Sequence, residues 1–222
     1  MLSIIVPTLN EAGGIVAALI RLAPLRRRGA EVIVADGGSD DGTVELAQPF
    51  ADTIVRAPRG RASQMNRGAA GASGDVLLFL HADTILPDGA DALIADDCTW
   101  GRFDVRIDGH HPLLRLVAAM MNLRSRLTSV CTGDQAIFVR RSLFAEIGGY
   151  PDIPLMEDIA LSKALRRHAS PVCLHQRVTT SGRRWETRGV MRTILLMWRL
   201  RFDYWRGVDP RELAIRYGYR PR

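Results

Sequence analysis

Two short polar clusters carry the side chains best suited to metal and acid–base chemistry. His81, Ala82 and Asp83 follow an apolar run, and a carboxylate in that place can hold Mg²⁺ or Mn²⁺ against a diphosphate, since hard cations prefer oxygen ligands. Glu157 and Asp158 begin a predicted helix, where a carboxylate either stabilises the helix end or serves as a general base near a hydroxyl. For each cluster the residues alone leave the structural and the chemical interpretation open.

Three further clusters have charge that suits a phosphorylated ligand. Asp36 precedes a glycine turn whose backbone amides are open to a ligand, while residues 40–43 are typical of a helix cap. Arg61 stands beside a glycine at a predicted helix start, where positive charge and free N–H groups either bind phosphate or face solvent. Arg184 and Trp185 either clamp a diphosphate and stack on a sugar, or cover a surface.

Short apolar runs alternate with helical patterns along the chain. The predicted strands are residues 2–6, 31–35, 53–55, 76–80 and 136–139, and the predicted helices are residues 11–28, 43–50, 62–72, 113–127, 142–147 and 157–168. Pro24 is expected to end or bend the first helix. Nearly continuous apolar strands separated by helices indicate an α/β fold with a mostly parallel sheet, buried on both faces. In such a sheet ligands bind outside the carboxyl ends of the strands, which is where the polar clusters fall.

Two segments in the second half of the chain are amphipathic. Residues 188–206 and 113–127 carry apolar side chains at helical spacing and arginines elsewhere. The apolar stripe of the later segment consists of Met191, Ile194, Leu195, Trp198, Phe202 and Trp205. Because such stripes belong more often to a core than to a membrane anchor, a core position is predicted, with interfacial membrane binding as the alternative.

Composition sets bounds on the class of protein. The 222 residues are 47% hydrophobic and 24% charged, which excludes a disordered, collagenous or coiled-coil chain and predicts one domain over residues 1–222. The net charge is +6, and Lys163 is the only lysine among 30 basic residues. This charge suits nucleic acid, an anionic membrane or a phosphorylated small molecule. Since only 6% of the residues are aromatic, nucleic acid is not expected as a partner.

Cysteine usage and hydropathy predict a cytoplasmic protein. Cys98, Cys131 and Cys173 are odd in number, lie far apart and form no C-x-x-C pair, so they favour a reducing compartment. No basic region precedes the first apolar run, and charged residues interrupt every apolar stretch before the length of a membrane span. We therefore expect a cytoplasmic location, which includes the inner face of the cell membrane if the amphipathic segments bind lipid.

The order and spacing of these clusters resemble a known family. The succession of residues 3–11, 36–39, 78–83, 133–135 and 157–158 is similar to that of family-2 glycosyltransferases with the GT-A fold. Within that family the chain resembles small members without a transmembrane tail, some of which are encoded beside radical-SAM enzymes. The resemblance implies a GT-A (Rossmann-like) α/β fold with a mixed, mostly parallel central sheet flanked by helices.

The same resemblance divides the single domain into three parts. A nucleotide-sugar-binding half is expected over about residues 1–100, an acceptor and catalytic half over about 101–185, and an amphipathic helical segment over 186–222. The donor contacts that the resemblance implies are Pro7, Thr8, Glu11, Asp36, Arg61, Asn66, His81, Ala82 and Arg184. Asp36 matches the carboxylate that receives the base, typically uracil. Asp83 matches the last aspartate of the D-x-D motif, which binds Mn²⁺ or Mg²⁺ on the donor diphosphate, although the first position is His81.

The resemblance also implies the acceptor side and the reaction. Asp158 matches the general base of the family's Glu-Asp motif, with Glu157 as its neighbour, and implies an inverting transfer to an acceptor hydroxyl. The implied acceptor contacts are Gly133, Asp134, Gln135 and Trp185. Arg184 and Trp185 are similar to the end of the Q-x-x-R-W motif of processive members, but Ser181 replaces its Gln, which argues against processive synthesis.

Two other functions and the identity of the acceptor stay open at this point. A sugar-phosphate nucleotidylyltransferase has a related architecture, but its glycine-rich N-terminal loop with a basic residue is missing from residues 7–11. A catalytically silent module that binds a nucleotide sugar or a membrane surface is compatible with the same residues. The acceptor is predicted to be either a small molecule or a lipid-linked one, the second with peripheral membrane contact.

Overall fold

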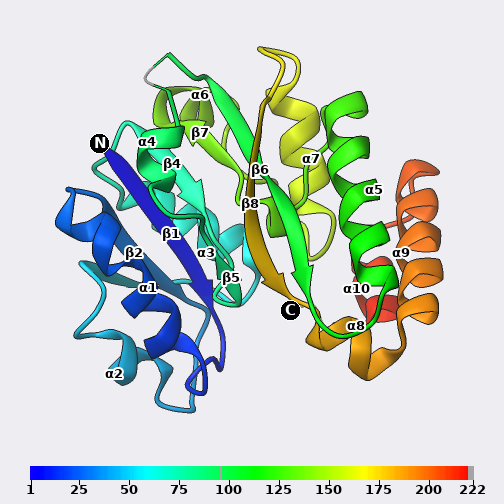
Figure 1. Ribbon diagram of the computed structural model, residues 1–222, viewed down its shortest axis with the longest axis horizontal. Helices are drawn as coiled ribbons and strands as arrows, with labels where there is room; N and C mark the ends of the chain where they lie inside the picture. The colour runs from blue at the N-terminus through cyan, green and yellow to red at the C-terminus, as the bar shows by residue number, and fades with distance from the viewer. Residues whose placement is uncertain (96, 220–222) are drawn as a thin grey trace.

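A computed structural model describes residues 1–95 and 97–219, which form a mixed eight-stranded sheet with helices on both faces (Figure 1). The strands are β1 Leu2–Thr8, β2 Glu31–Asp36, β3 Thr53–Arg56, β4 Val76–Phe79, β5 Thr84–Ile85, β6 Trp100–Asp108, β7 Phe138–Arg140 and β8 Val172–Ser181. The helices are α1 Ile15–Arg27, α2 Thr43–Ala47, α3 Arg61–Ala70, α4 Ala90–Leu93, α5 Leu113–Thr128, α6 Arg141–Glu146, α7 Glu157–Leu165, α8 Arg183–Arg188, α9 Val190–Trp205 and α10 Pro210–Tyr217, with a 3₁₀ helix η1 at Gly133–Gln135.

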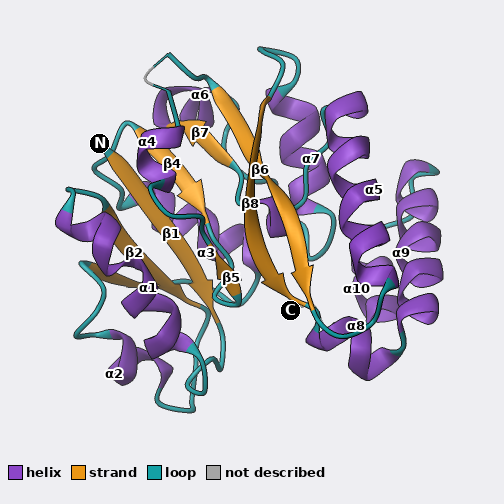
Figure 2. Ribbon diagram, viewed as in Figure 1, coloured by secondary structure: helices purple, strands orange, loops and turns teal. Residues whose placement is uncertain are grey.

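The sheet is mostly parallel, as the sequence predicts. Its strand order is β3-β2-β1-β4-β7-β6-β8-β5, and β1 pairs in parallel with both β2 and β4. Strand β7 runs antiparallel between β4 and β6, and β5 runs antiparallel to β8 at the edge (Figure 2). Because β1, β2 and β4 are parallel, the residues that follow them lie at one edge of the sheet, which we call the carboxyl edge.

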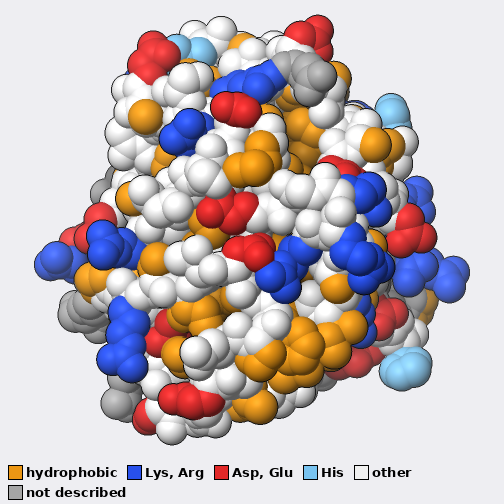
Figure 3. All heavy atoms as spheres, turned by 90° about the vertical axis from the view of Figure 1, so that its left-hand side faces the viewer, with side chains coloured by type: hydrophobic (Ala, Val, Ile, Leu, Met, Phe, Trp, Pro, Cys, Tyr) orange, Lys and Arg blue, Asp and Glu red, His pale blue; other side chains and the backbone are white. Residues whose placement is uncertain are grey.

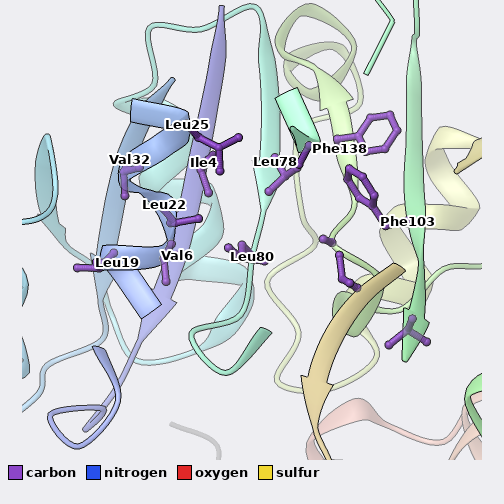
Figure 4. Packing of buried hydrophobic residues seen from close by; sticks show 14 of the residues in the cluster. Ile4, Val6, Leu19, Leu22, Leu25, Val32, Leu78, Leu80, Phe103 and Phe138 are labelled. Atoms are coloured by element: carbon purple, nitrogen blue, oxygen red, sulfur yellow. The ribbon is translucent and has the colours of Figure 1, made fainter. Parts of the chain in front are cut away.

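Alternation along the strands fills two hydrophobic cores. In β1, Ile4 and Val6 pack on the face covered by α1 and α5, and Figure 4 shows them beside Leu19 and Leu22 of α1. The neighbouring Ile5 points to the other face, where α3, α6 and α7 cover the sheet. Both faces are therefore buried, which explains why the central strands have nearly continuous apolar sequences.

The first helix is shorter than predicted at its start and passes through its proline. Helix α1 begins at Ile15 rather than at Glu11, because residues 9–14 form a loop in which Asn10 has a φ of 55°. Pro24 lies inside α1, which continues to Arg27, so the proline does not end this helix. The chain leaves the helix at Gly29, whose φ of 94° suits a residue without a Cβ.

Two long strands lie outside the predicted set. Strand β6 alternates Phe103, Val105 and Ile107 with charged residues, and β8 is mainly polar, so neither has the apolar run typical of a central strand. The predicted strand 136–139 begins later than expected, as β7 at Phe138, because η1 occupies residues 133–135 and Ala136 has a φ of 47°.

The predicted core position of the two amphipathic segments is wrong for most of their apolar residues. In α9 the buried residues are Val190, Thr193 and Leu200, which lie outside the predicted stripe. The stripe and its counterpart on α5 supply eight large apolar side chains that are more than half exposed: Leu116, Met120, Leu127, Met191, Leu195, Trp198, Phe202 and Trp205. The opposite side of the molecule, which carries α1 and α2 and is seen face-on in Figure 3, shows charged side chains interspersed with apolar ones. The two helices therefore pack by narrow faces and leave their apolar stripes accessible.

None of the helices formed by the described residues has the length and apolar character needed to cross a bilayer.

Candidate active site

A cavity of about 530 Å³ opens beside the carboxyl edge and continues between α5 and α9. Its polar end is formed by Arg61, His81, Asp134, Glu157 and Asp158. These residues come from the start of α3, the loop after β4, η1 and the start of α7. The structure therefore brings together five of the residues singled out in the sequence, from segments spread over about a hundred positions.

Asp158 is held in place by backbone groups at the end of the cavity. The Gly133 N–H donates to Asp158 Oδ2 at 3.1 Å, and the Ile159 N–H donates to Asp158 Oδ1 at 2.7 Å. Burial raises the pKa of Asp158 more than these two hydrogen bonds and Arg61 lower it, and the carboxylate of Asp134 raises it further. A carboxylate with fixed geometry and a raised pKa is suited to accept a proton near neutral pH.

Glu157 adjoins Asp158 and is almost fully buried. Burial, followed by repulsion from Asp158, raises the pKa of Glu157 to about 7, although Arg61 opposes the shift. The preceding residue, Met156, adopts a left-handed conformation with a φ of 70°, which is uncommon for a side chain of this size. The chain thus accepts both backbone strain and carboxylate repulsion at this point, which is typical of functional sites.

Arg61 is the cation that faces the carboxylates. Burial disfavours its charge, but the carboxylates of Glu157, Asp134 and Asp158 outweigh this effect and raise the pKa of its guanidinium. The side chain lines the cavity, so its fork remains accessible to a ligand anion. Arg61 is thus an exposed residue at the start of α3 that also lines the cavity, so the structure is compatible with both interpretations that the sequence left open.

His81 and η1 form the wall between the carboxyl edge and the carboxylate pair. His81 Nδ1 lies 3.4 Å from Asp134 Oδ1, and the ring is largely buried. A Cβ on Gly133 would lie 2.6 Å from Cε1 and Nε2 of this ring, so a side chain at that position would displace the ring. Burial raises the pKa of Asp134, but the hydrogen bond and the charge of His81, together with Arg61, lower it overall.

Glu11 and Asp83 both follow strands at the carboxyl edge, close enough for their charges to interact. Burial raises the pKa of Glu11, and the negative charge of Asp83 raises it further. The carboxylate of Asp83 is exposed and accepts a hydrogen bond only from its neighbour Thr84, at 3.4 Å, among the described residues. Across residues 1–95 and 97–219, no group of three or more His, Cys, Asp or Glu side chains is placed to hold a metal. One exposed carboxylate fits a cation such as Mg²⁺ that takes its other ligands from phosphates and water.

Asp36 lies at the end of β2 and holds the turn that follows it. It accepts hydrogen bonds from the Gly38 N–H at 2.9 Å, from the Ser39 N–H and from Ser39 Oγ at 2.5 Å. The sequence did not reveal this role, because the turn brings the chain back onto the carboxylate. Thr8, at the end of β1, pairs with Asp36 in the sheet and is buried. Its hydroxyl has no hydrogen-bond partner among the described residues.

Gln64 fixes the geometry of the carboxyl edge and was missed in the sequence. Its Nε2 donates to the carbonyl oxygens of Thr8 at 2.6 Å and Ala35 at 2.9 Å, and the side chain is buried. It therefore ties the ends of β1 and β2 to α3. Its position three residues after Arg61 in a helix is a weak signal, because glutamine at a helix surface is ordinary.

Two predicted contact residues use their side chains elsewhere. Asn66 Nδ2 donates to the Tyr150 carbonyl at 2.8 Å, and Asn66 Oδ1 accepts from the Tyr150 N–H at 2.8 Å. Gln135 is buried, donates to Ser125 Oγ at 3.0 Å and is not among the residues that line the cavity. The structure does not bring either side chain into the cavity, and both support loops beside it. Pro7 and Ala82 likewise lie at the carboxyl edge and not on the cavity wall.

Arg184 and Trp185 lie in the first turn of α8. Trp185 lines the cavity, whereas Arg184 stacks over the ring of Tyr217, another lining residue, with its Cζ 4.4 Å from the ring centroid. Burial lowers the pKa of Arg184, and the positive charge of Arg61 lowers it further. Two guanidinium groups that repel each other mark a place where an anion is favoured.

The sequence missed the far end of the cavity. From α5 it is lined by Leu113, Leu116, Val117, Met120, Met121 and Arg124. From α9 it is lined by Met191, Ile194, Met197, Trp198 and Arg201. The amphipathic pattern was visible in both segments, but it does not say whether a stripe is covered by core or left open.

The fold and the carboxyl-edge site define a GT-A-type α/β protein, and comparison with known families agrees. Residues 3–143 match the family model described as Glycosyl transferase family 2. This chain belongs to that family.

Curated relatives share the family and are longer than this chain. It is 36% identical over 172 residues to a "PGL/p-HBAD biosynthesis glycosyltransferase" of Mycobacterium bovis, an alignment that covers 68% of this chain and 63% of the relative. It is 38% identical over 94 residues to the "Succinoglycan biosynthesis protein ExoA" of Rhizobium meliloti, covering 38% of this chain and 28% of the relative.

Solved structures share the fold. The mannosyltransferase PcManGT of Pyrobaculum calidifontis, in complex with GDP-Man and Mn²⁺, matches with a TM-score of 0.64 and 23% identity over 99% of this chain and 65% of its own. TarS 1-349 of S. aureus, in complex with UDP, matches with a TM-score of 0.64 and 19% identity over 81% of this chain and 60% of its own. At these identities the likeness shows the common fold and leaves the ligands of this chain to be inferred.

Proposed function

We propose that this chain is an inverting glycosyltransferase that moves a sugar from a UDP-linked donor to an acceptor hydroxyl, with Asp158 as the general base. The observation that carries the proposal is the Glu157–Asp158 pair at the polar end of the cavity. Its pKa values are raised by burial, Gly133 orients the base, and Arg61 faces both carboxylates. The family model matches residues 3–143, which include Arg61 and Gly133, and the carboxylate pair follows that match.

The donor would lie along the carboxyl edge. In this arrangement the base of the nucleotide meets the turn held by Asp36, close to the ends of β1 and β2. The diphosphate lies toward Arg61 and Arg184, whose mutual repulsion an anion relieves. Support for a nucleotide donor comes from structures of similar fold that contain UDP or GDP-Man.

Asp83 would hold a divalent cation on the donor diphosphate. Its carboxylate is exposed, and its negative charge adds to burial in raising the pKa of Glu11. Bound there, Mn²⁺ or Mg²⁺ would supply charge stabilisation for the leaving diphosphate. Support for a metal comes from the Mn²⁺ present in the PcManGT complex.

In the transfer step, Asp158 accepts the proton of the acceptor hydroxyl as the oxygen attacks the anomeric carbon of the sugar. The bond between that carbon and the diphosphate oxygen breaks on the opposite face, so the configuration inverts. Arg61 and Arg184 stabilise the charge that grows on the departing diphosphate. The raised pKa of Asp158 makes proton transfer to it more favourable than transfer to an ordinary aspartate.

A thermal-shift panel of UDP, GDP, dTDP and ADP, each with and without Mn²⁺ or Mg²⁺, tests the donor assignment. A ligand at about 100 times its Kd adds roughly 2.7 kcal/mol to stability. We expect UDP to stabilise the wild type only with metal, and the Asp83→Asn variant to lose this effect. Equal stabilisation without metal, or by the variant, would remove Asp83 from the metal site.

Turnover separates the transferase from a silent binding module. The assay measures release of UDP from UDP-glucose, UDP-galactose and UDP-N-acetylglucosamine, first with water as acceptor. A transferase should release UDP slowly without acceptor and faster when a suitable hydroxyl is added. Tight UDP binding without any release from these or other UDP-sugars would favour the silent module instead.

A further inference from the structure

The cavity does not end at the carboxylate pair but continues as a groove between α5 and α9, called the α5–α9 groove below. Leu116 and Met120 of α5 face Met191 and Trp198 of α9 across it, and all four are more than half exposed. Helices α5 and α9 stand side by side in Figure 1, with α10 behind them. A groove that joins the proposed base to open apolar surface has the form of a binding site for part of a substrate.

Two arginines interrupt the apolar walls. Arg124 of α5 and Arg201 of α9 both line the groove. The Nε and Nη2 atoms of Arg124 are buried and have no hydrogen-bond partner among the described residues. Burial lowers the pKa of Arg124, and Asp158 is the main charge that opposes this shift. Two buried guanidinium nitrogens without hydrogen-bond acceptors are costly to the protein alone, and an anionic group of a ligand would supply the acceptors.

We propose that the α5–α9 groove binds the acceptor and selects an amphipathic one: its apolar chain lies between Leu116, Met120 and Trp198, and its anionic group pairs with Arg124 and Arg201. The acceptor hydroxyl then reaches Asp158 at the inner end of the groove. This inference rests on the proposed function, because it assigns the acceptor class of the same site. It makes Arg124 and Trp198 specificity residues that contact the acceptor.

Apolar side chains on the same helices provide a matched control. Trp198 and Trp205 both lie on α9 and are 66% and 75% exposed, but only Trp198 lines the groove. If the exposed stripe served only to bind a membrane surface or a second copy of this chain, the two tryptophans would contribute alike. An acceptor site predicts that they differ.

The first experiment measures binding without turnover, using the whole chain. Decyl phosphate, below its micellar concentration, is titrated into the wild type, Trp198→Ala and Trp205→Ala, and binding is followed by calorimetry. We expect Trp198→Ala to weaken binding at least tenfold and Trp205→Ala to change it less than twofold. Equal weakening by both variants, or no binding by the wild type, would overturn the proposal. Circular dichroism and UDP affinity confirm that each variant is folded.

The second experiment tests the charge. Decyl phosphate is compared with neutral octyl glucoside and with glycerol phosphate, which has the anion without the chain. We expect Arg124→Gln to weaken the binding of decyl phosphate at least tenfold and the binding of octyl glucoside less than twofold. Arg199→Gln is the control, because Arg199 is an exposed arginine of α9 that pairs with Asp203 and lies outside the groove. Glycerol phosphate binding as tightly as decyl phosphate would show that the chain is not recognised and would overturn the proposal.

The third experiment separates this inference from the proposed function. UDP release from the active UDP-sugar is measured with 1-O-decylglycerol 3-phosphate, whose hydroxyl lies close to its phosphate, and with octyl glucoside and glycerol as acceptors. We expect the lowest acceptor KM for the decylglycerol phosphate, with Trp198→Ala raising that KM at least tenfold. If the protein turns over all three acceptors with the same KM, the proposed function stands and the assignment of the groove as the acceptor site is overturned. If the protein binds decyl phosphate in the groove but neither binds UDP nor releases it from a UDP-sugar, the proposed function is overturned.

Discussion

The carboxyl edge and the α5–α9 groove meet at Asp158, but they are built in different ways. At the carboxyl edge, short side chains and backbone amides hold each other: Asp36 binds its own turn, and Gln64 ties two strand ends together. In the groove, long and flexible side chains such as Met120 and Met191 stand half exposed on two helices. The first arrangement suits a ligand of fixed shape such as a nucleotide, while the second suits an apolar chain that adapts to its site.

The largest expected effect lies where the two regions meet. We expect Asp158→Asn to lower kcat by more than roughly 10²-fold, since an amide cannot accept the acceptor proton. The amide oxygen can still accept from the Gly133 N–H, while the Ile159 N–H loses its acceptor. The affinity for UDP should be preserved, because the proposed donor site lies along the carboxyl edge. The measurement is kcat at saturating donor, together with UDP affinity by calorimetry. A variant that turns over normally would remove Asp158 from the role of base.

The carboxyl edge should tolerate substitutions less well than the α5–α9 groove does. We expect Gln64→Ala to destabilise the fold by roughly 1–3 kcal/mol, because it removes two hydrogen bonds of a buried side chain, to the carbonyls of Thr8 and Ala35, of which the first still accepts from the Gly37 N–H. Urea unfolding of the wild type and the variant measures the difference. The same variant should also weaken UDP binding, since the ends of β1 and β2 are no longer tied to α3. An unchanged midpoint would mean that this edge is not fixed by Gln64.

The carboxylate pair should make stability depend on pH. Burial raises the pKa of Glu157 from 4.5 to about 7, so the folded state binds its proton more tightly than the unfolded state does. Stability from this group is therefore present at low pH and is lost as the pH rises from about 4.5 to about 7. We expect Glu157→Gln to stabilise the fold by roughly 1–3 kcal/mol more at pH 8 than at pH 4.5.

Urea unfolding of the wild type and Glu157→Gln at both pH values checks this expectation. The buried glutamine cannot ionise, so the variant should lack the part of the pH dependence that Glu157 causes. Should the variant be less stable than the wild type at pH 8, the attraction between Glu157 and Arg61 would outweigh the effect of burial. That outcome would contradict the raised pKa of Glu157.

The same difference between the regions explains what the sequence could predict. Parallel strands place the residues that follow them at one edge, so the positions of Asp36 and Asp83 follow from strand order and local pattern. The resemblance in motif order to the family then assigned Asp158 to the same site. Asn66 and Gln135 were assigned to ligand contacts, yet they bind the backbone of Tyr150 and the side chain of Ser125. A motif position does not reveal whether a polar side chain is already used inside the protein.

The helical half was harder to predict, because tertiary packing decides it. Strand β6 carries the fully buried Arg102, which pairs with Asp104, so charged residues interrupt the apolar pattern typical of a central strand. The stripes of α5 and α9 have the spacing of core helices, and only the arrangement of the two helices shows that Trp198 is exposed. Periodicity identifies an apolar face but not what covers it.

The smallest expected effect belongs to the groove. Because Trp198 is 66% exposed, we expect Trp198→Ala to lower the free energy of unfolding by less than about 1 kcal/mol, whereas a buried tryptophan such as Trp100 would cost about 3–5 kcal/mol. Urea unfolding of both alanine variants measures the two values. A large cost at Trp198 would mean that the groove walls support the fold as the carboxyl edge does. A small cost together with weakened binding of decyl phosphate would mean that this exposed apolar surface is kept for a ligand rather than for stability.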